Sequence, residues 1–261
     1  MEEIAERTSN QKKNHLSFSP SHRTIPRSAH PEPRKPTFMN PWIVLDQTTV
    51  PGDDGEMKLL QRGHEYTINV KNEELMNSQL HGSEDALAEI TCKPLATARR
   101  PKVLVGGLGM GFTLGAALKY LGPQANVIVA ELVPAVIEWN RTHLADLADR
   151  PLEDSRVTVR QGDVTRVIQE KANTYDAILL DVDNGPEGLT HEGNDRLYSP
   201  AGLVEAKKAL KPGGVLAIWS AFPDKKFTKR LRCAGFNVEE VPARARGSRG
   251  RWHNIWLAKK V

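Results

Sequence analysis

An alternation of short apolar runs and helical segments, which begins after Pro101, constrains the fold of this chain most strongly. The expected strands are 102–106, 127–131, 157–160, 175–181 and 214–219, and the expected helices are 113–121, 134–143, one from about 164, and 200–210. Such units build a parallel sheet covered by helices on both faces. A helix over 226–233 and strands near 236–240 and 253–258 should close the sheet with an antiparallel edge. We therefore predict an α/β fold with a doubly wound, mostly parallel sheet.

The chain before this alternation divides into two parts. Up to residue 41 it carries six of its 17 prolines among Ser, Arg, Lys and His, with almost no apolar periodicity, so residues 1–40 are expected to form a disordered tail. Residues 41–80 contain strand-like runs at 42–45, 57–61 and 66–70 and a turn at Gly63, which predict a small β-hairpin module. Residues 81–261 form the main domain. It opens with a helix over 82–90 that Ser83 is expected to cap.

Composition narrows the function classes. Cys92 and Cys233 stand in unrelated contexts, which leaves neither a disulfide framework nor a Cys-rich metal site, so we expect a reducing compartment and no bound metal. No stretch approaches the roughly 20 apolar residues of a membrane span. We expect a cytoplasmic protein with no membrane partner. The net charge of +4 is unevenly distributed along the chain, because residues 225–261 hold 11 Lys and Arg against two Glu. Such a basic segment is typical of either a solvated face or an anion-binding face.

Chemistry is expected where the strands end, because open α/β sheets bind ligands at the carboxyl edge. The first strand ends in Gly107, Gly109 and Gly111, which allow the backbone to turn tightly and lie close to a nucleoside. The second strand ends in Glu131, about 20 residues beyond the glycines, where a carboxylate accepts hydrogen bonds from ribose hydroxyls. These four residues predict a nucleoside-binding edge.

Three further acids follow the next strands. Asp163 comes after the third strand and is placed to accept the exocyclic amine of adenine, to cap the following helix, or both. Asp181 ends the apolar run of the fourth strand, and Asp183 follows it. An acid at the end of a buried strand is costly unless it has a partner or a task. Asp181 and Asp183 are therefore the candidate catalytic residues.

These strand ends resemble the spermidine synthase (polyamine aminopropyltransferase) family. The resemblance rests on PKVLVGGLG at 101–109, AELV at 130–133, GD at 162–163, YDAILLD at 175–181 and LKPGG at 210–214. It implies the Rossmann-like class I methyltransferase fold and an adenosyl sulfonium donor, either S-adenosyl-L-methionine or decarboxylated S-adenosylmethionine. It also implies that Gly107, Gly109, Gly111, Glu131 and Asp163 bind this donor. Related enzymes often pair as dimers, so a homodimer is one expected assembly.

The chain departs from the family's pattern at three places. The family's first loop usually has an Asp where this chain has Gly109, and the second acid of its Asp-x-x-Asp-Pro motif falls on Asn184. In the corresponding helix the family usually has a Tyr before its Glu, whereas this chain has Leu87 before Glu89. Each change removes a group that would hold a cationic amine, and each such contact contributes about 1.5 to 3 kcal/mol.

Three functional hypotheses remain open. The favoured one is S-adenosylmethionine-dependent methyl transfer to a small-molecule or peptide nucleophile, because the nucleoside site is intact and the polyamine positions are altered. The alternative is polyamine aminopropyl transfer from decarboxylated S-adenosylmethionine, with Asp181 and Asp183 replacing the usual acid pair. The third is a non-catalytic protein that binds a nucleoside or, through the Arg/Gly segment 244–251, a nucleic acid. A small-molecule acceptor, which an amine would fit, is expected ahead of a nucleic-acid partner.

Several other residues are weaker candidates. Residues 187–198, with His191 and Tyr198, suit either an acceptor lid or a plain connection. His81 and the acids Glu84, Asp85 and Glu89 lie where the family's acceptor channel begins, although an acidic first turn is also what a helix prefers. Trp219 ends the fifth strand and is interpreted as a core residue ahead of a substrate contact. The Arg/Gly segment is interpreted as a long hairpin loop.

Overall fold

The computed structural model describes residues 40–52, 55–182, 196–246 and 249–261. The predicted disordered tail, apart from residue 40, lies outside these residues. So do Asp183, Asn184 and His191. Within them, no helix is long and apolar enough to cross a membrane.

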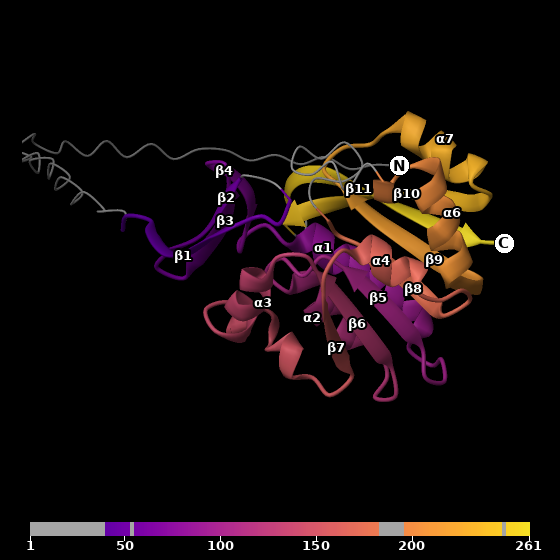
Figure 1. The fold of residues 1–261 in the computed structure, drawn as a ribbon, viewed down its shortest axis with the longest axis horizontal. Helices are drawn as coiled ribbons and strands as arrows, with labels where there is room; N and C mark the ends of the chain where they lie inside the picture. The colour runs from indigo at the N-terminus through magenta and orange to yellow at the C-terminus, as the bar shows by residue number, and fades with distance from the viewer. Residues whose placement is uncertain (1–39, 53–54, 183–195, 247–248) are drawn as a thin grey trace, which may run out of the picture. The chain divides into compact units, whose positions relative to one another are not determined.

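A seven-stranded sheet forms the main domain (Figure 1) and confirms the predicted α/β class. Its strand order is β10-β11-β9-β8-β5-β6-β7, and β11 runs antiparallel to both of its neighbours, as expected for the closing edge. The strands are β5 Lys102–Gly106, β6 Asn126–Glu131, β7 Val157–Gln161, β8 Tyr175–Leu180, β9 Leu210–Ser220, β10 Phe236–Arg246 and β11 Arg249–Lys260. The α-helices are α1 Gly82–Cys92, α2 Phe112–Tyr120, α3 Pro134–Arg141, α4 Val164–Gln169, α6 Pro200–Ala209 and α7 Lys225–Cys233. Short 3-10 helices span Lys93–Leu95, Ala145–Ala148 and Pro151–Glu153.

The two faces of this sheet bury two apolar clusters. Successive side chains of a strand point to opposite faces, so Val103 and Val105 of β5 pack on one side and Leu104 on the other. The first side is covered by α1, α2 and α3, and its cluster includes Leu87. The second side is covered by α4, α6 and α7, and Phe227 of α7 is fully buried. Both faces are apolar and covered, which is why the parallel strands of this sheet read as continuous apolar runs.

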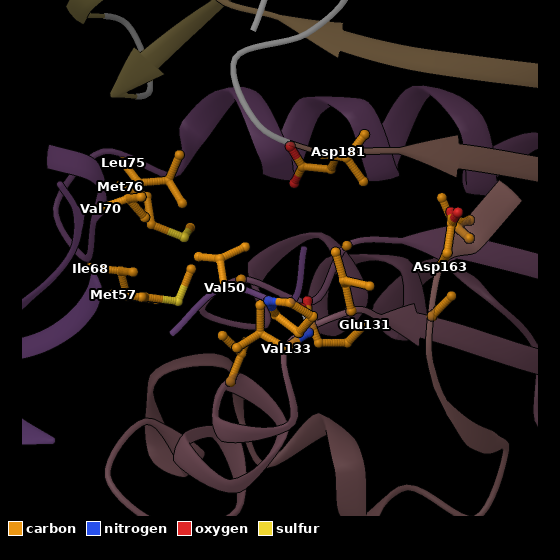
Figure 2. A pocket seen from close by; sticks show the side chains of 18 of the residues that line it. Val50, Met57, Ile68, Val70, Leu75, Met76, Glu131, Val133, Asp163 and Asp181 are labelled. Atoms are coloured by element: carbon orange, nitrogen blue, oxygen red, sulfur yellow. Dashed lines mark hydrogen bonds between the residues drawn. The ribbon is translucent and has the colours of Figure 1, made fainter. Parts of the chain in front are cut away.

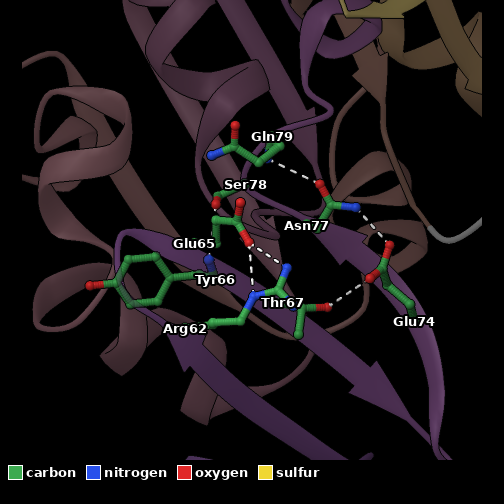
Figure 3. Close-up of polar contacts among 8 residues, drawn as sticks. All are labelled: Arg62, Glu65, Tyr66, Thr67, Glu74, Asn77, Ser78 and Gln79. Atoms are coloured by element: carbon green, nitrogen blue, oxygen red, sulfur yellow. Dashed lines mark hydrogen bonds and ion pairs between the residues drawn. The ribbon is translucent and has the colours of Figure 1, made fainter. Parts of the chain in front are cut away.

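A separate four-stranded antiparallel sheet precedes α1, in the order β1-β2-β3-β4. Its strands are β1 Ile43–Thr49, β2 Glu56–Arg62, β3 Glu65–Val70 and β4 Glu73–Asn77. The sequence predicted the first three strands and missed β4, whose polar residues lack strand character. Strand β4 pairs with β3, and side-chain contacts add to this pairing. The Thr67 hydroxyl lies 3.1 Å from the Met76 carbonyl oxygen and 3.4 Å from Glu74 Oε2, and Asn77 donates to Glu74 Oε1 at 2.6 Å; Figure 3 shows the two contacts of Glu74. Strand β4 carries Met76, whose side chain lines a pocket at the end of the main sheet.

Two local predictions were wrong. Ser83 does not cap α1, since His81 holds the N-cap position and no side chain caps the helix. Ser83 lies instead inside the first turn and is completely buried. The Arg/Gly segment does not form a long loop, because β10 extends to Arg246 and β11 begins at Arg249. Cross-strand pairing therefore continues almost to the tip of the hairpin.

Candidate functional site

The strand order reverses between β5 and β8, and a pocket opens there at the carboxyl ends of the strands. The chain runs outward from β5 through β6 to β7 and then crosses to β8 on the other side of β5. Figure 2 shows Asp181 above the pocket, Glu131 and Val133 below it, and Asp163 at one end. Side chains of the N-terminal sheet line the opposite end.

The glycine loop contributes Gly107 and Gly109 to the lining of this pocket, and the backbone at Gly107, Gly109 and Gly111 favours glycine. Gly107 has φ 85°, and a Cβ there would lie 2.3 Å from the Asp181 carbonyl oxygen. Gly109 has φ 51°, and a Cβ there would lie 2.9 Å from Met76 Sδ. Both are left-handed conformations that favour glycine. Asn140 braces the loop by donating to the Gly109 carbonyl at 2.7 Å. The third glycine, Gly111, is the N-cap of α2.

Glu131 ends β6 and lies buried beside the glycine loop. Its Oε2 accepts from the Leu108 backbone N–H at 2.9 Å, and its Oε1 accepts from the Val133 N–H at 2.8 Å. Burial raises the pKa of this carboxyl, while the backbone donors act in the opposite direction. A carboxylate oxygen accepts more than one hydrogen bond, so the group that braces the loop can also accept ribose hydroxyls.

Asp163 occupies the end of the pocket farthest from the N-terminal sheet. Its Oδ1 accepts from the Thr165 backbone N–H at 2.7 Å, which makes Asp163 the N-cap of α4. The structure therefore gives it the capping role that the sequence allowed. Since it also lines the pocket, a role in recognising the adenine amine stays a proposal.

Asp181 follows β8 directly and is only partly exposed. Thr113, in the first turn of α2, donates its hydroxyl to Asp181 Oδ2 at 2.5 Å. Burial raises the pKa of Asp181 to about 6, and the Thr113 hydrogen bond limits that rise. Such a carboxyl exchanges its proton close to neutral pH, which is a property of general bases.

A second acid that lines the same pocket is Glu84 of α1. Its side chain is buried, and Ser83 donates to its Oε2 at 2.6 Å. Burial, followed by the negative charge of Asp181, raises the pKa of Glu84 to about 8. Two acids that each disfavour the ionisation of the other share a proton over the neutral range. Glu84 and Asp181 are therefore the acid pair of the pocket.

The opposite end of the pocket is apolar. It is formed by side chains of the N-terminal sheet and the turn after β1, as Figure 2 shows: Val50, Met57, Ile68, Val70, Leu75 and Met76. Met76 lies over Gly109, where the family usually has an Asp, so a side chain at that position would require the end of the methionine to move. We call these six residues the apolar wall.

Charge is distributed unevenly around the pocket. Four of its lining residues are acids, namely Glu84, Glu131, Asp163 and Asp181. Among the residues that the structure describes, none of those lining the pocket is Lys, Arg or His. The site therefore suits a ligand of net positive charge.

The structure brings together most of the sequence candidates and separates the rest. Gly107, Gly109, Glu131, Asp163 and Asp181 line one pocket, and Asp183 lies outside the described residues. The predicted acids of α1 lie in different environments. Glu84 lines the pocket, whereas the exposed side chains of Asp85 and Glu89 pair with His81 and Lys93.

Two of the weaker aromatic candidates pack in the core. Tyr198 is buried edge-to-face against Phe227, so packing explains its position. Trp219 belongs to the core and also lines the pocket.

Sequence reasoning did not find Thr113 or Met76. Thr113 follows the glycine loop by two positions, but nothing in the local pattern indicates which way its hydroxyl points. Met76 belongs to a strand that was not predicted.

A family model confirms the resemblance seen in the motifs. The spermine/spermidine synthase domain matches residues 87–227, which include the ends of β5, β6, β7 and β8. The chain belongs to the spermine/spermidine synthase family. The match begins after Glu84 and ends before β10, so the first turn of α1 and the closing hairpin lie outside it.

Curated relatives of this family member align over about half of the chain. The polyamine aminopropyltransferase of Prochlorococcus marinus is 31% identical over 129 residues, which are 49% of this chain and 43% of that protein. The putrescine N-methyltransferase 1 of Nicotiana tabacum is 34% identical over 125 residues, 47% of this chain and 32% of the relative. The chain thus spans less than half the length of the curated relatives it matches.

Solved structures of the family share the fold. The spermidine synthase from Thermotoga maritima superposes with a TM-score of 0.66 at 16% identity, covering 84% of this chain and 72% of that one. A spermidine synthase in complex with the transition state analogue AdoDATO gives a TM-score of 0.64 at 18% identity, with the same coverage. These likenesses establish the architecture.

Proposed function

We propose that this protein transfers an aminopropyl group from decarboxylated S-adenosylmethionine to an amine. The observation that carries the proposal is the charge of the pocket, where four described lining residues are acids and none is basic. S-adenosylmethionine carries an α-carboxylate that would meet no cationic side chain among these described lining residues, whereas the decarboxylated donor lacks it. The polyamine aminopropyltransferases among the relatives support the same choice over the methyl transfer favoured by the sequence.

The nucleoside half of the donor fits the edge formed by β5, β6 and β7. The glycine loop leaves space where side chains would protrude, so the backbone at Gly107 and Gly109 can lie against the ligand. We assign Glu131 to the ribose hydroxyls and Asp163 to the adenine amine. Both carboxylates are already oriented by backbone N–H groups, so binding needs little reorganisation.

The acid pair then lies where the transferred group meets its acceptor. When bound, the sulfonium donor supplies an alkyl carbon activated for displacement by an amine. Asp181 takes the proton from the attacking nitrogen, as the new carbon–nitrogen bond forms and the carbon–sulfur bond breaks with its electrons on sulfur. Thr113 holds Asp181 in position through its hydrogen bond. Glu84 attracts the remaining positive charge of the substrates. Alignment of nitrogen, carbon and sulfur supplies most of the acceleration.

Turnover with each donor in turn tests this proposal. Purified protein is incubated with decarboxylated S-adenosylmethionine or with S-adenosylmethionine, in the presence of putrescine and other amines, and the thioether product is identified. We expect methylthioadenosine from the decarboxylated donor. S-adenosylhomocysteine as the only thioether product would overturn the proposal.

Formation of S-adenosylhomocysteine would indicate methyl transfer instead, and two observations keep this reaction as the second candidate. The putrescine N-methyltransferases match the chain at 34% identity, as well as the aminopropyltransferases do. In addition, Met76 lies over Gly109, where the family's usual Asp would bind the amine of an aminopropyl group. The acid pair would serve either reaction, because both need a base for the acceptor amine.

A further inference from the structure

Three polar side chains connect the pocket with the surface of the protein. Glu84 lines the pocket, Ser83 next to it is completely buried, and His253 of β11 is half-buried. Ser83 Oγ lies 2.6 Å from Glu84 Oε2 and 2.8 Å from His253 Nδ1. The serine hydroxyl therefore bridges an acid of the site and an imidazole that is 170 positions away in the sequence.

A serine hydroxyl has one proton, so this chain of hydrogen bonds has two consistent arrangements. When Glu84 is ionised, Ser83 donates to Glu84 and His253 donates from Nδ1 to Ser83. When Glu84 is protonated, Glu84 donates to Ser83, Ser83 donates to Nδ1, and the ring carries its proton on Nε2. The two arrangements differ by one proton and by the tautomer of His253.

The groups around the chain place this change near neutral pH. Asp181 faces Glu84 from the end of β8 and His81 faces it from the start of α1, and together with burial they leave the pKa of Glu84 at about 8. Around His253, the ring of Trp219 packs edge-on at 4.8 Å and Arg251 adds a positive charge. Burial and that charge lower the pKa of His253, so the ring stays neutral while Glu84 titrates.

We propose that Ser83 and His253 form a proton relay that exchanges the proton of Glu84 with bulk water. In this step the Glu84 proton moves to Ser83 Oγ, the Ser83 proton moves to His253 Nδ1, and the Nε2 proton leaves to water. A cationic substrate, as the proposed function requires, favours ionised Glu84 and closes the direct route through the pocket. The relay gives the proton a route that does not pass through the occupied pocket. The proton can therefore leave while the substrate is bound and return after product release.

Ser83 and His253 lie outside residues 87–227, the part of the chain that the family model matches. Ser83 and His253 are positioning residues, because they act through Glu84. Their juxtaposition depends on the packing of α1 against the closing hairpin of the sheet, where α1 contacts β10 and β11.

The tautomer of His253 tests the relay without any need for turnover. We would label the histidines of the full chain with 15N and record the ring nitrogen shifts of His253 from pH 6.5 to 9.5. The expected result is a switch from the Nε2–H tautomer to the Nδ1–H tautomer as Glu84 ionises near pH 8. Ser83→Ala and Glu84→Gln should each abolish the switch.

A matched control comes from the same helix. Thr91 is buried, and its hydroxyl has no hydrogen-bond partner in the part of the chain that the structure describes, so Thr91→Ala removes a similar group outside the relay and should keep the switch. The same tautomer at both ends of the pH range, or a switch that survives in Ser83→Ala or Glu84→Gln, would overturn the relay. Failure of the proposed function is distinct, because it would appear as no methylthioadenosine while the switch persists.

Discussion

The two pairs of acids in the pocket are held in different ways. Glu131 and Asp163, which we assign to the nucleoside, accept hydrogen bonds from backbone N–H groups. Glu84 and Asp181, which we assign to the acceptor, accept them from side-chain hydroxyls, and the charge of Asp181 acts on Glu84. Backbone donors belong to the fold and cannot turn away, so they fix the orientation of a carboxylate. Hydroxyls can reverse their role, which suits acids that exchange protons.

This contrast predicts opposite results for the same kind of substitution. Asp181→Asn keeps the shape of the side chain and removes the base, so turnover should fall at least about 100-fold. The affinity for methylthioadenosine, measured by calorimetry, should stay unchanged. Asp176→Asn is the matched control, since Asp176 lies on β8, the strand that Asp181 follows, and pairs with Lys211 away from the pocket. Unchanged turnover in Asp181→Asn would remove this residue from the mechanism.

Glu131→Gln should instead reduce binding. The amide keeps one acceptor oxygen, but its NH₂ group would face a backbone N–H of Leu108 or Val133, and the ribose would lose a charged acceptor. We expect the affinity for methylthioadenosine to fall about 10- to 100-fold, since hydrogen bonds to charged groups contribute about 1.5 to 3 kcal/mol. Glu138→Gln, an exposed acid of α3, is the control that should bind normally. Equal affinity in both variants would contradict the role given to Glu131.

The pH dependence of stability sharpens the contrast for Glu84. Its pKa rises from 4.5 to about 8 on folding, so the stability that this carboxyl contributes is present below pH 4.5 and is lost as pH rises towards 8. Glu84→Gln cannot ionise. Between pH 5 and 9 the free energy of unfolding of the variant, relative to wild type, should therefore rise by about 1 to 3 kcal/mol. Urea unfolding at both pH values measures it, and a difference that does not change with pH would refute the raised pKa.

The strand ends were predictable from sequence because they follow from local pattern. An acid or glycine placed directly after an apolar run must lie at the carboxyl edge of a parallel sheet, which is how Gly107, Glu131 and Asp181 were found. Glu84 was visible only as one of three acids in α1, since helix periodicity does not say which face meets the pocket.

The remaining features depend on contacts between distant segments. Met76 reaches Gly109 from a strand whose polar residues gave no strand signal. Ser83 has the residue type of a helix cap, yet it is buried against His253 at the far end of the chain. Tertiary packing decided both positions, and local propensity contains no information on it.

Calorimetry with the two donors tests the central claim most directly, namely that a pocket whose described lining residues include four acids and no base selects an adenosyl ligand without a carboxylate. Decarboxylated S-adenosylmethionine and S-adenosylmethionine are titrated separately into the full-length protein at the same pH and ionic strength. The account predicts clearly tighter binding of the decarboxylated donor. Equal or tighter binding of S-adenosylmethionine, or no binding of either donor, would contradict it.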